Sequence, residues 1–161
     1  MLKKMLTILG LTGTLVIAAQ PALAVAWGPQ STYYKGEKRA TGSGDFTNDG
    51  NAFAVNRMTV VDDAPRDGNT VYGVTTYFFF YNRCDGDLRT DDDCYDSWHR
   101  DPRPDKTDEF HGGGAGGKSF KHHEELDSRA SKVRVETSAC VQMGWPVPDG
   151  CAPASYPSFE Y

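Results

Sequence analysis

The segment with the most recognisable chemical pattern is Gly112–Ser119, which reads GGGAGGKS and fits the phosphate-binding expression G-x-x-x-x-G-K-[ST]. That pattern binds a nucleotide when a buried strand enters the glycine loop and a helix leaves it, because the amides at the helix start meet the phosphates. Here the polar residues 106–111 lead into the loop, and Phe120–Glu124 after it makes a poor buried helix. We therefore predict a flexible loop and no nucleotide ligand.

An esterase-like motif overlaps the same loop. Residues His111–Gly114 spell HGGG, which forms the oxyanion hole of some esterases when a serine stands in a G-x-S-x-G turn elsewhere. Ser43 lies in the sequence TGSG and lacks the first of those glycines. The motif has no nucleophile to serve, and we predict no catalytic residue from it.

Two segments contain residue types that can bind metal ions. Five aspartates lie within Asp85–Asp93, and carboxylates of this kind can surround Ca²⁺, but the glycine and glutamate positions of an EF-hand are absent. We predict a solvated surface loop there, and the sequence leaves calcium binding by it open. The adjacent His122 and His123 would point to opposite faces of a strand, so no metal site and no cofactor is predicted.

The N-terminus predicts export. Met1–Ala24 reads as a signal peptide, with two early lysines, a short apolar run, and small residues before Val25. A second A-x-A leaves Trp27 as an alternative mature start. We expect a secreted, extracellular protein with one domain over 25–161 and no membrane segment after cleavage, because no other apolar run approaches the length that spans a bilayer.

The charge balance excludes one class of partner. The chain has 17 Lys+Arg and 22 Asp+Glu, a net charge of −5, and removal of Lys3 and Lys4 with the signal makes the remainder −7. An acidic chain without a basic block is a poor candidate for binding nucleic acid.

The four cysteines all follow the signal, and an even number in an exported chain predicts disulfides. Of the three possible pairings, the sequence favours the two local ones, Cys84–Cys94 and Cys140–Cys151, since each closes a loop rich in Asp, Gly or Pro. Each would stabilise the fold by about 3 kcal/mol at most. A four-cysteine metal site would need C-x-x-C pairs, which are absent.

The elements between these residues read as short strands. Leu88 and Leu126 are the two leucines after the signal, and β-branched and aromatic residues alternate between clusters of turn residues. The turns are expected at Gly42–Gly44, Asn48–Asn51, Asp67–Asn69, Asp85–Asp87, 112–117 and Pro148–Gly150. The strands are expected at Thr32–Ala40, Ala52–Val61, Asn69–Asn82, Phe120–Leu126, Arg129–Val141 and Ser155–Tyr161.

These strands predict an all-β fold, an antiparallel sandwich or barrel-like domain of about seven strands with two local disulfides and long polar loops. Asn69–Asn82 is apolar on both faces and is expected at the centre of a sheet. Asp62–Gly68 is expected to close a hairpin between it and Ala52–Val61, with a β-bulge near Asn56 and Arg57. The polar stretch from Asp85 to Phe110 reads as a long excursion.

The surplus of aromatic residues is the strongest functional signal. Most will fill the core, but Tyr and Trp on a face or an edge provide large contact areas for a partner protein. We select as candidate binding residues Trp27, Tyr33, Tyr34, Trp98 and Trp145. Trp27, in the sequence WGP near the mature start, is a candidate tether.

Several segments resemble a known group of proteins: Trp27–Pro29, Arg39–Phe46, Asp67–Tyr72 and Cys140–Cys151, together with the aromatic C-terminus. They resemble small secreted proteins of filamentous spore-forming bacteria. Within that group the chain is similar to the small adaptor subunit of umbrella toxin particles, which joins a lectin subunit to a repeat-containing toxin stalk. The resemblance implies an adaptor but assigns no functional residue.

The function expected from the sequence is therefore a secreted, non-enzymatic module that binds other secreted proteins. Two alternatives stay open. One is a secreted hydrolase that uses paired carboxylates on a carbohydrate, since acids are plentiful. The other is a protease inhibitor that presents the disulfide-closed loop 146–150, stiffened by Pro146 and Pro148.

Overall fold

The computed structural model describes residues 24–84, 94–144 and 146–161. The predicted signal residues 1–23, the acidic loop Asp85–Asp93 and Trp145 lie outside the described residues. The described part contains strands and no helix, which confirms the all-β prediction, and its strands number ten where about seven were expected. They are β1 (Val25–Tyr34), β2 (Glu37–Asp49), β3 (Phe53–Asp62), β4 (Thr70–Cys84), β5 (Cys94–Arg100), β6 (Asp105–Lys106), β7 (Lys118–Glu125), β8 (Lys132–Gln142), β9 (Gly150–Cys151) and β10 (Ser158–Glu160). No helix in these residues is long and apolar enough to cross a bilayer.

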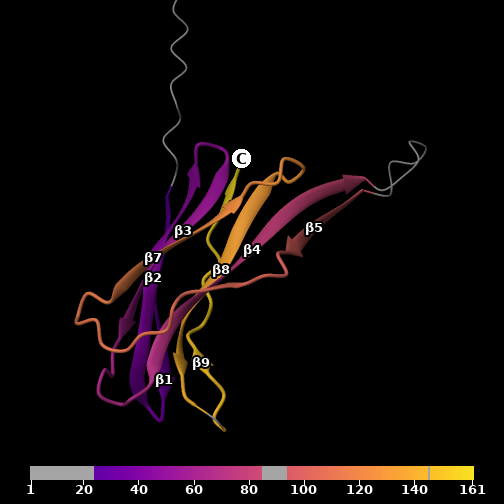
Figure 1. Ribbon diagram of the computed structural model, residues 1–161. Helices are drawn as coiled ribbons and strands as arrows, with labels where there is room; N and C mark the ends of the chain where they lie inside the picture. The colour runs from indigo at the N-terminus through magenta and orange to yellow at the C-terminus, as the bar shows by residue number, and fades with distance from the viewer. Residues whose placement is uncertain (1–23, 85–93, 145) are drawn as a thin grey trace, which may run out of the picture.

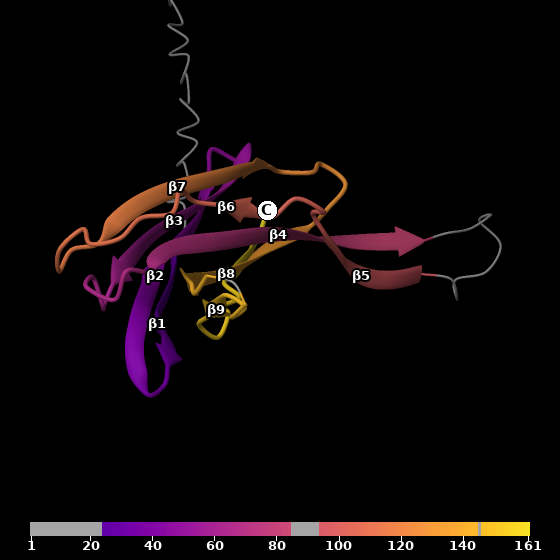
Figure 2. The ribbon, with the colours of Figure 1, turned by 60° about the horizontal axis from the view of Figure 1, so that its bottom comes forward.

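The strands form two antiparallel sheets (Figure 1). The first has the order β1-β2-β3-β7, and the second has the order β10-β8-β4-β5, with β6 paired to β4 and β9 paired to β8. The β1–β2 turn and β9 lie at one end of the molecule, away from the C-terminal end of β4 and the start of β5. Figure 2 shows these ends of β4 and β5 extending beyond the other strands of their sheet.

The alternation of side chains in β8 follows the predicted pattern. Val133, Val135, Thr137 and Ala139 are buried, while the residues between them are partly exposed. Strand β4 lies between β8 on one side and β5 and β6 on the other, so its prediction as a central strand is confirmed. Its odd-numbered residues, such as Tyr77, fill the core between the sheets.

The predicted hairpin through Asp62–Gly68 is wrong. Strand β3 pairs with β2 and β7 in the first sheet, whereas β4 pairs with strands of the second sheet. Residues 63–69 therefore carry the chain from one sheet to the other. Proximity in sequence suggested a hairpin, but both hydrogen-bonding edges of β3 are occupied by other strands.

The predicted bulge near Asn56 and Arg57 is also absent, since the register of β3 with β2 and with β7 is continuous there. The sequence suggested a bulge because a polar residue interrupts the apolar alternation. Asn56 instead points inward with Ala54 and Met58 and is fully buried. Its hydrogen bonds, described below, make the inward position tolerable.

The N-terminal region differs from its prediction in two ways. Thr32–Ala40 is not one strand, because Lys35 and Gly36 have positive φ values of 51° and 80° and make the turn between β1 and β2. The expected turn at Gly42–Gly44 lies inside β2. Glycine is required there for space, since a Cβ on Gly44 would overlap the Arg57 carbonyl oxygen of β3.

The core has two apolar clusters with a polar layer between them. One contains Trp27, Met58 and Val71, and the other contains Phe46, Tyr77 and Val133. Between the clusters, the Asn56 amide nitrogen donates to Thr75 Oγ1 at 2.9 Å and to Thr137 Oγ1 at 3.1 Å. Asn56 thus joins β3 of the first sheet to β4 and β8 of the second.

The Cys140–Cys151 disulfide is present and connects β8 to β9, as predicted. Cys140 is completely buried. The backbones of Cys84 and Cys94 are paired directly across β4 and β5, but their side chains lie outside the described part. The Cys84–Cys94 bridge therefore stays a prediction.

Candidate functional site: an aromatic and basic face on the second sheet

The outer side of the second sheet carries two adjacent rows of aromatic and charged residues. The strand registers align Glu160, Lys132, Phe80 and Trp98 in one row, and Ser158, Arg134, Phe78 and Arg100 in the next. Residues two apart on a strand share a face, and Tyr77 and Phe79 occupy the core side of β4. Phe78 and Phe80 therefore face outward. We call the following set the aromatic face: Phe78, Phe80, Trp98, Lys132, Arg134 and Tyr156.

The rings and cations of the aromatic face are in contact. The Phe80 and Trp98 ring centroids are 5.1 Å apart. The guanidinium carbon of Arg134 lies 4.5 Å from the Trp98 centroid, 4.8 Å from that of Phe78 and 5.9 Å from that of Tyr156. Distances below about 6 Å allow a cation–π attraction. The guanidinium of Arg134 is thus surrounded by three rings.

Solvent reaches this face. Tyr156 is 55% exposed, and Phe78, Phe80 and Trp98 are each partly exposed. Their packing on one another makes a contiguous apolar surface rather than scattered single residues. Such surfaces mark interaction sites more often than isolated exposed rings do.

Arg134 has no carboxylate partner among the described residues. Its Nε is buried without a hydrogen-bond partner. Arg39 also has a buried Nε, but its two terminal nitrogens donate to Asp67 and Glu37, each at 2.6 Å. Lys132, next to Arg134, pairs with Glu160 at 2.5 Å. Among the described residues, the groups that surround the Arg134 guanidinium are aromatic rings.

The predicted binding residues are distributed over three environments. Trp98 lies on the aromatic face, as part of β5, inside a region that the sequence had assigned to an irregular excursion. Tyr33, 63% exposed, and Tyr34 lie at the end of β1, beside the β1–β2 turn. Trp145 lies outside the described residues.

Trp27, the candidate tether, is a core residue with 6% exposure. It stands opposite Gly44 in the β1–β2 register, and its ring passes close to Gly42. Because Gly42 and Gly44 of β2 are glycines without a Cβ, they leave the space that the indole fills. The glycines that the sequence assigned to a turn thus explain why this tryptophan faces inward.

Five residues of the aromatic face were not selected from the sequence: Phe78, Phe80, Lys132, Arg134 and Tyr156. Alternation in β8 does place Arg134 on the outer side, and β4 does have a second aromatic side. The missing information was the β4–β8 register, which sets Arg134 directly opposite Phe78.

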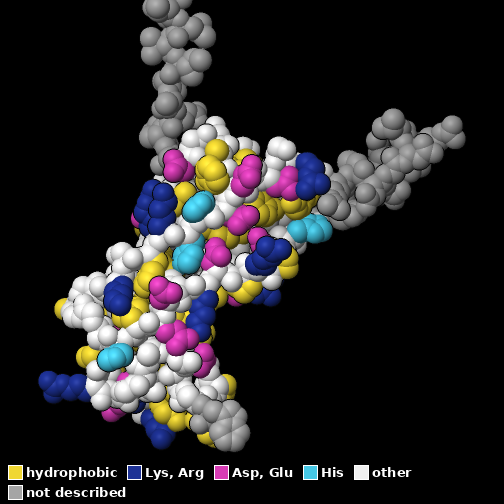
Figure 3. Space-filling model, in the orientation of Figure 1, with side chains coloured by type: hydrophobic (Ala, Val, Ile, Leu, Met, Phe, Trp, Pro, Cys, Tyr) yellow, Lys and Arg dark blue, Asp and Glu magenta, His cyan; other side chains and the backbone are white. Residues whose placement is uncertain are grey.

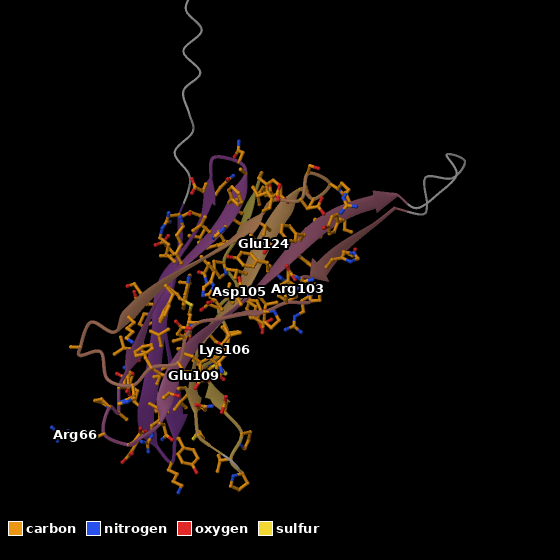
Figure 4. All side chains as sticks on the ribbon, in the orientation of Figure 1. Arg66, Arg103, Asp105, Lys106, Glu109 and Glu124 are labelled. Carbon is orange, nitrogen blue, oxygen red and sulfur yellow. A yellow bond between two sulfur atoms is a disulfide. The ribbon has the colours of Figure 1, made fainter. Side chains whose placement is uncertain are left out.

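A second cluster of titratable residues occupies the junction of β7 with β6 and its preceding loop, and we call it the acidic seam: Tyr77, Asp101, Asp105, His122 and Glu124. Figure 3 shows acidic and histidine side chains gathered on this side of the molecule, and Figure 4 labels Asp105 and Glu124 close to one another. His122 Nδ1 lies 3.6 Å from Asp105 Oδ2. His123, on the opposite face of β7, contacts the Phe53 ring instead.

Burial controls the protonation of the acidic seam. Partial burial, followed by the charges of Asp101 and Asp105, raises the pKa of Glu124 above its ordinary value. Burial lowers the pKa of His122 despite the opposing effect of Asp105. Tyr77 Oη and His122 Nε2 are both buried without a hydrogen-bond partner. A carboxyl group that keeps its proton to higher pH can act as a general acid.

The described residues contain no group of three or more potential ligands that could hold a metal ion. The acidic seam is therefore not arranged as a metal site within that part of the chain.

The glycine loop does not have the phosphate-binding architecture. A strand, β7, begins at Lys118, where a helix would have to start. The Gly112 amide donates to Asp62 Oδ2 at 2.7 Å. Lys118 lies over the Phe110 ring, with Nζ 4.7 Å from the centroid.

An open groove of about 410 Å³ on the first sheet is lined by Gly44, Asp45, Arg57, Met58, Thr59, Ser119, Phe120 and Lys121. Its polar groups largely satisfy each other, because Arg57 donates to Asp45 and Thr47, each at 3.1 Å, and the Thr59 and Ser119 hydroxyls are 3.0 Å apart. This self-pairing distinguishes the groove from the aromatic face.

The disulfide-closed loop 146–150 is held by specific contacts. Tyr72 Oη donates to Asp149 Oδ2 at 2.7 Å, and the Val147 amide donates to the Gly144 carbonyl at 3.0 Å. Val147 is 37% exposed. The loop is thus preorganised around a tight turn.

Comparisons of this chain with protein-family models, with curated proteins and with solved structures find no match.

Proposed function

We propose that this protein is a secreted, non-enzymatic module that binds another secreted protein through its aromatic face. The observation that carries the proposal is the packing of Phe78, Trp98 and Tyr156 around the unpaired guanidinium of Arg134. Trp, Tyr and Arg dominate the energetic centres of protein–protein interfaces. Trp and Tyr bury large areas with few rotatable bonds, and the planar guanidinium of Arg both stacks on rings and donates several hydrogen bonds.

An adaptor must hold two partners at once, and the fold offers a second surface for this. The β1–β2 turn, next to the exposed Tyr33, lies with β9 at the end of the molecule away from the C-terminal end of β4 (Figure 1). The 37% exposed Val147 belongs to the loop that precedes β9. Two separate exposed surfaces support the proposed role of joining subunits in an extracellular toxin complex.

The test is affinity purification of the tagged protein from the culture fluid of the organism that makes it. Proteins recovered with it are identified by mass spectrometry, and their affinity is measured with purified components. We expect Trp98→Ala and Tyr156→Ala each to weaken binding by at least about tenfold, as truncation of interface centres does. Phe53→Ala, which removes a 40% exposed ring from the first sheet, is the matched control.

Two results would count against this proposal. One is recovery of the protein alone, as a monomer by light scattering. The other is partner binding that both aromatic-face variants leave unchanged. Tyr156 is more than half exposed, so its variant tests binding even if Trp98→Ala lowers stability.

A second candidate function, hydrolysis of a carbohydrate, is favoured by one observation. Burial, followed by the charges of Asp101 and Asp105, raises the pKa of Glu124, and a carboxyl group that keeps its proton can act as the general acid of a glycosidase. The test is release of reducing sugar from a panel of polysaccharides. Activity that Glu124→Gln abolishes and Glu125→Gln retains would support hydrolysis, and no activity on any substrate would contradict it.

A further inference from the structure

We propose that Arg134 is the anchor of the aromatic face and that it binds the carboxylate of an Asp or Glu side chain presented by the protein partner. This inference rests on the proposed function and specifies the chemistry that the partner must supply. The guanidinium contacts the rings and keeps its terminal N–H donors for a partner. Its carbon lies over the Phe78 and Trp98 rings, its Nε is buried without a partner, and its terminal N–H groups have no partner among the described residues.

A guanidinium stacked in this way is suited to a carboxylate. Stacking uses the flat faces of the group, while its N–H donors lie in the plane and match two carboxylate oxygens. The contacts at 4.5 Å to Trp98 and 4.8 Å to Phe78 restrict the side chain before any partner arrives. A partner carboxylate therefore meets a donor group that is already oriented, which reduces the entropy lost on binding.

The surrounding charges favour a single carboxylate over a polyanion. Lys132 is already paired with Glu160, so it adds little attraction for a second anion. The whole chain is acidic, with a net charge of −5, which disfavours a phosphate-rich polymer. The partly exposed rings beside Arg134 would also contact apolar or aromatic residues next to the partner's acid.

The first experiment uses a matched pair of blocked dipeptides, acetyl-Glu-Trp-amide and acetyl-Gln-Trp-amide, titrated into the ¹⁵N-labelled full mature chain. The resonances followed are Arg134 Nε–H and Trp98 Nε1–H. We expect the glutamate peptide to shift Arg134 Nε–H saturably and the glutamine peptide to bind at least about tenfold more weakly, because a charge-assisted hydrogen bond is lost. Arg134→Lys should remove the difference, while Arg57→Lys, which alters an arginine already paired with Asp45, should preserve it.

Three outcomes would overturn the inference. The two peptides could bind equally well, or Arg134→Lys could keep the preference for glutamate. The glutamate peptide could also give no saturable shift up to about 100 mM, which exceeds the dissociation constants of roughly 6 to 80 mM expected for one charge-assisted hydrogen bond. Inorganic phosphate is a third ligand in the same titration, and tighter binding of phosphate would assign the site to phosphorylated ligands instead.

The second experiment separates this inference from the proposed function. Arg134→Lys and Trp98→Ala are compared in the partner-capture assay. Loss of capture in both variants supports the anchor role. If Trp98→Ala loses the partner and Arg134→Lys retains it at full affinity, the aromatic face binds a protein but the carboxylate inference fails.

Discussion

Trp27 and Asn56 are joined by a buried hydrogen bond, in which the indole Nε1 donates to the Asn56 Oδ1 at 3.0 Å. The same asparagine donates to Thr75 and Thr137, which are paired across β4 and β8. One side-chain amide therefore connects β1, β3 and both central strands of the second sheet. The relationship explains why a polar residue can sit at the interior of this small core.

Replacing Asn56 with Leu should destabilise the fold by about 3 kcal/mol, because it leaves the buried indole N–H and two threonine hydroxyls without this partner. Urea unfolding monitored by tryptophan fluorescence measures the change. Asn82→Ala, at an exposed position of β4, should change stability by less than about 0.5 kcal/mol. Equal effects of the two substitutions would contradict a structural role for the Asn56 network.

Removing the Cys140–Cys151 bridge with Cys140→Ala and Cys151→Ala together should cost about 3 kcal/mol, since it releases a loop between residues 11 apart in sequence. Thermal unfolding of this variant is compared with that of the intact protein. A melting temperature equal to that of the parent would show that Tyr72 and Asp149 hold the loop without the bridge.

Peptide mapping without reductant should also find Cys84 linked to Cys94, and a bridge from either residue to Cys140 or Cys151 would refute the local pairing.

Asp127 makes the stability of the C-terminal part of the second sheet dependent on pH, so that stability is lost in acid. Hydrogen bonds from Arg129, then from Tyr81, hold the pKa of Asp127 well below its ordinary value of 3.8. A lowered carboxyl pKa contributes stability above the ordinary value, and this contribution is lost as pH falls through the lower folded value. Asp127→Asn should therefore cost about 1 kcal/mol at neutral pH, allowing for partial solvent exposure.

The cost of Asp127→Asn should shrink as the pH falls below 3.8, because the parent carboxylate also becomes neutral. Denaturant unfolding at a series of pH values measures this trend. Asp96→Asn, which also replaces a carboxylate by an amide, at an exposed position of β5, is the matched control. A cost that stays constant into strong acid would refute the assignment.

Glu124 should behave in the opposite way. A raised carboxyl pKa contributes stability below the ordinary value of 4.5, and that stability is lost as pH rises through the folded value. Glu124→Gln resembles the protonated state and should therefore stabilise the protein at pH 7, by about 0.5 kcal/mol for a partly exposed group. The gain should disappear below the ordinary value of 4.5, and Glu125→Gln at the exposed neighbouring position of β7 is the matched control.

Much of the architecture could be predicted because its signals are local. Alternation in Lys132–Gln142 and the two apolar sides of Thr70–Cys84 depend on neighbouring residues along one strand. The Cys140–Cys151 bridge followed from a short loop rich in turn residues. The predictions that failed, the hairpin at Asp62–Gly68 and the bulge at Asn56, required knowledge of which strands pair.

The sequence alone determined that this chain forms antiparallel strands. It also determined which residues of each strand share a side, because side-chain alternation is a property of the extended backbone. Only the tertiary structure decided the strand partners and their register, since pairing depends on contacts between residues far apart in the chain. Register brings Arg134 opposite Phe78 and beside Trp98, and it places Trp27 over the glycines of β2 in the core. The candidate binding face is therefore a product of pairing, and no single stretch of the sequence contains it.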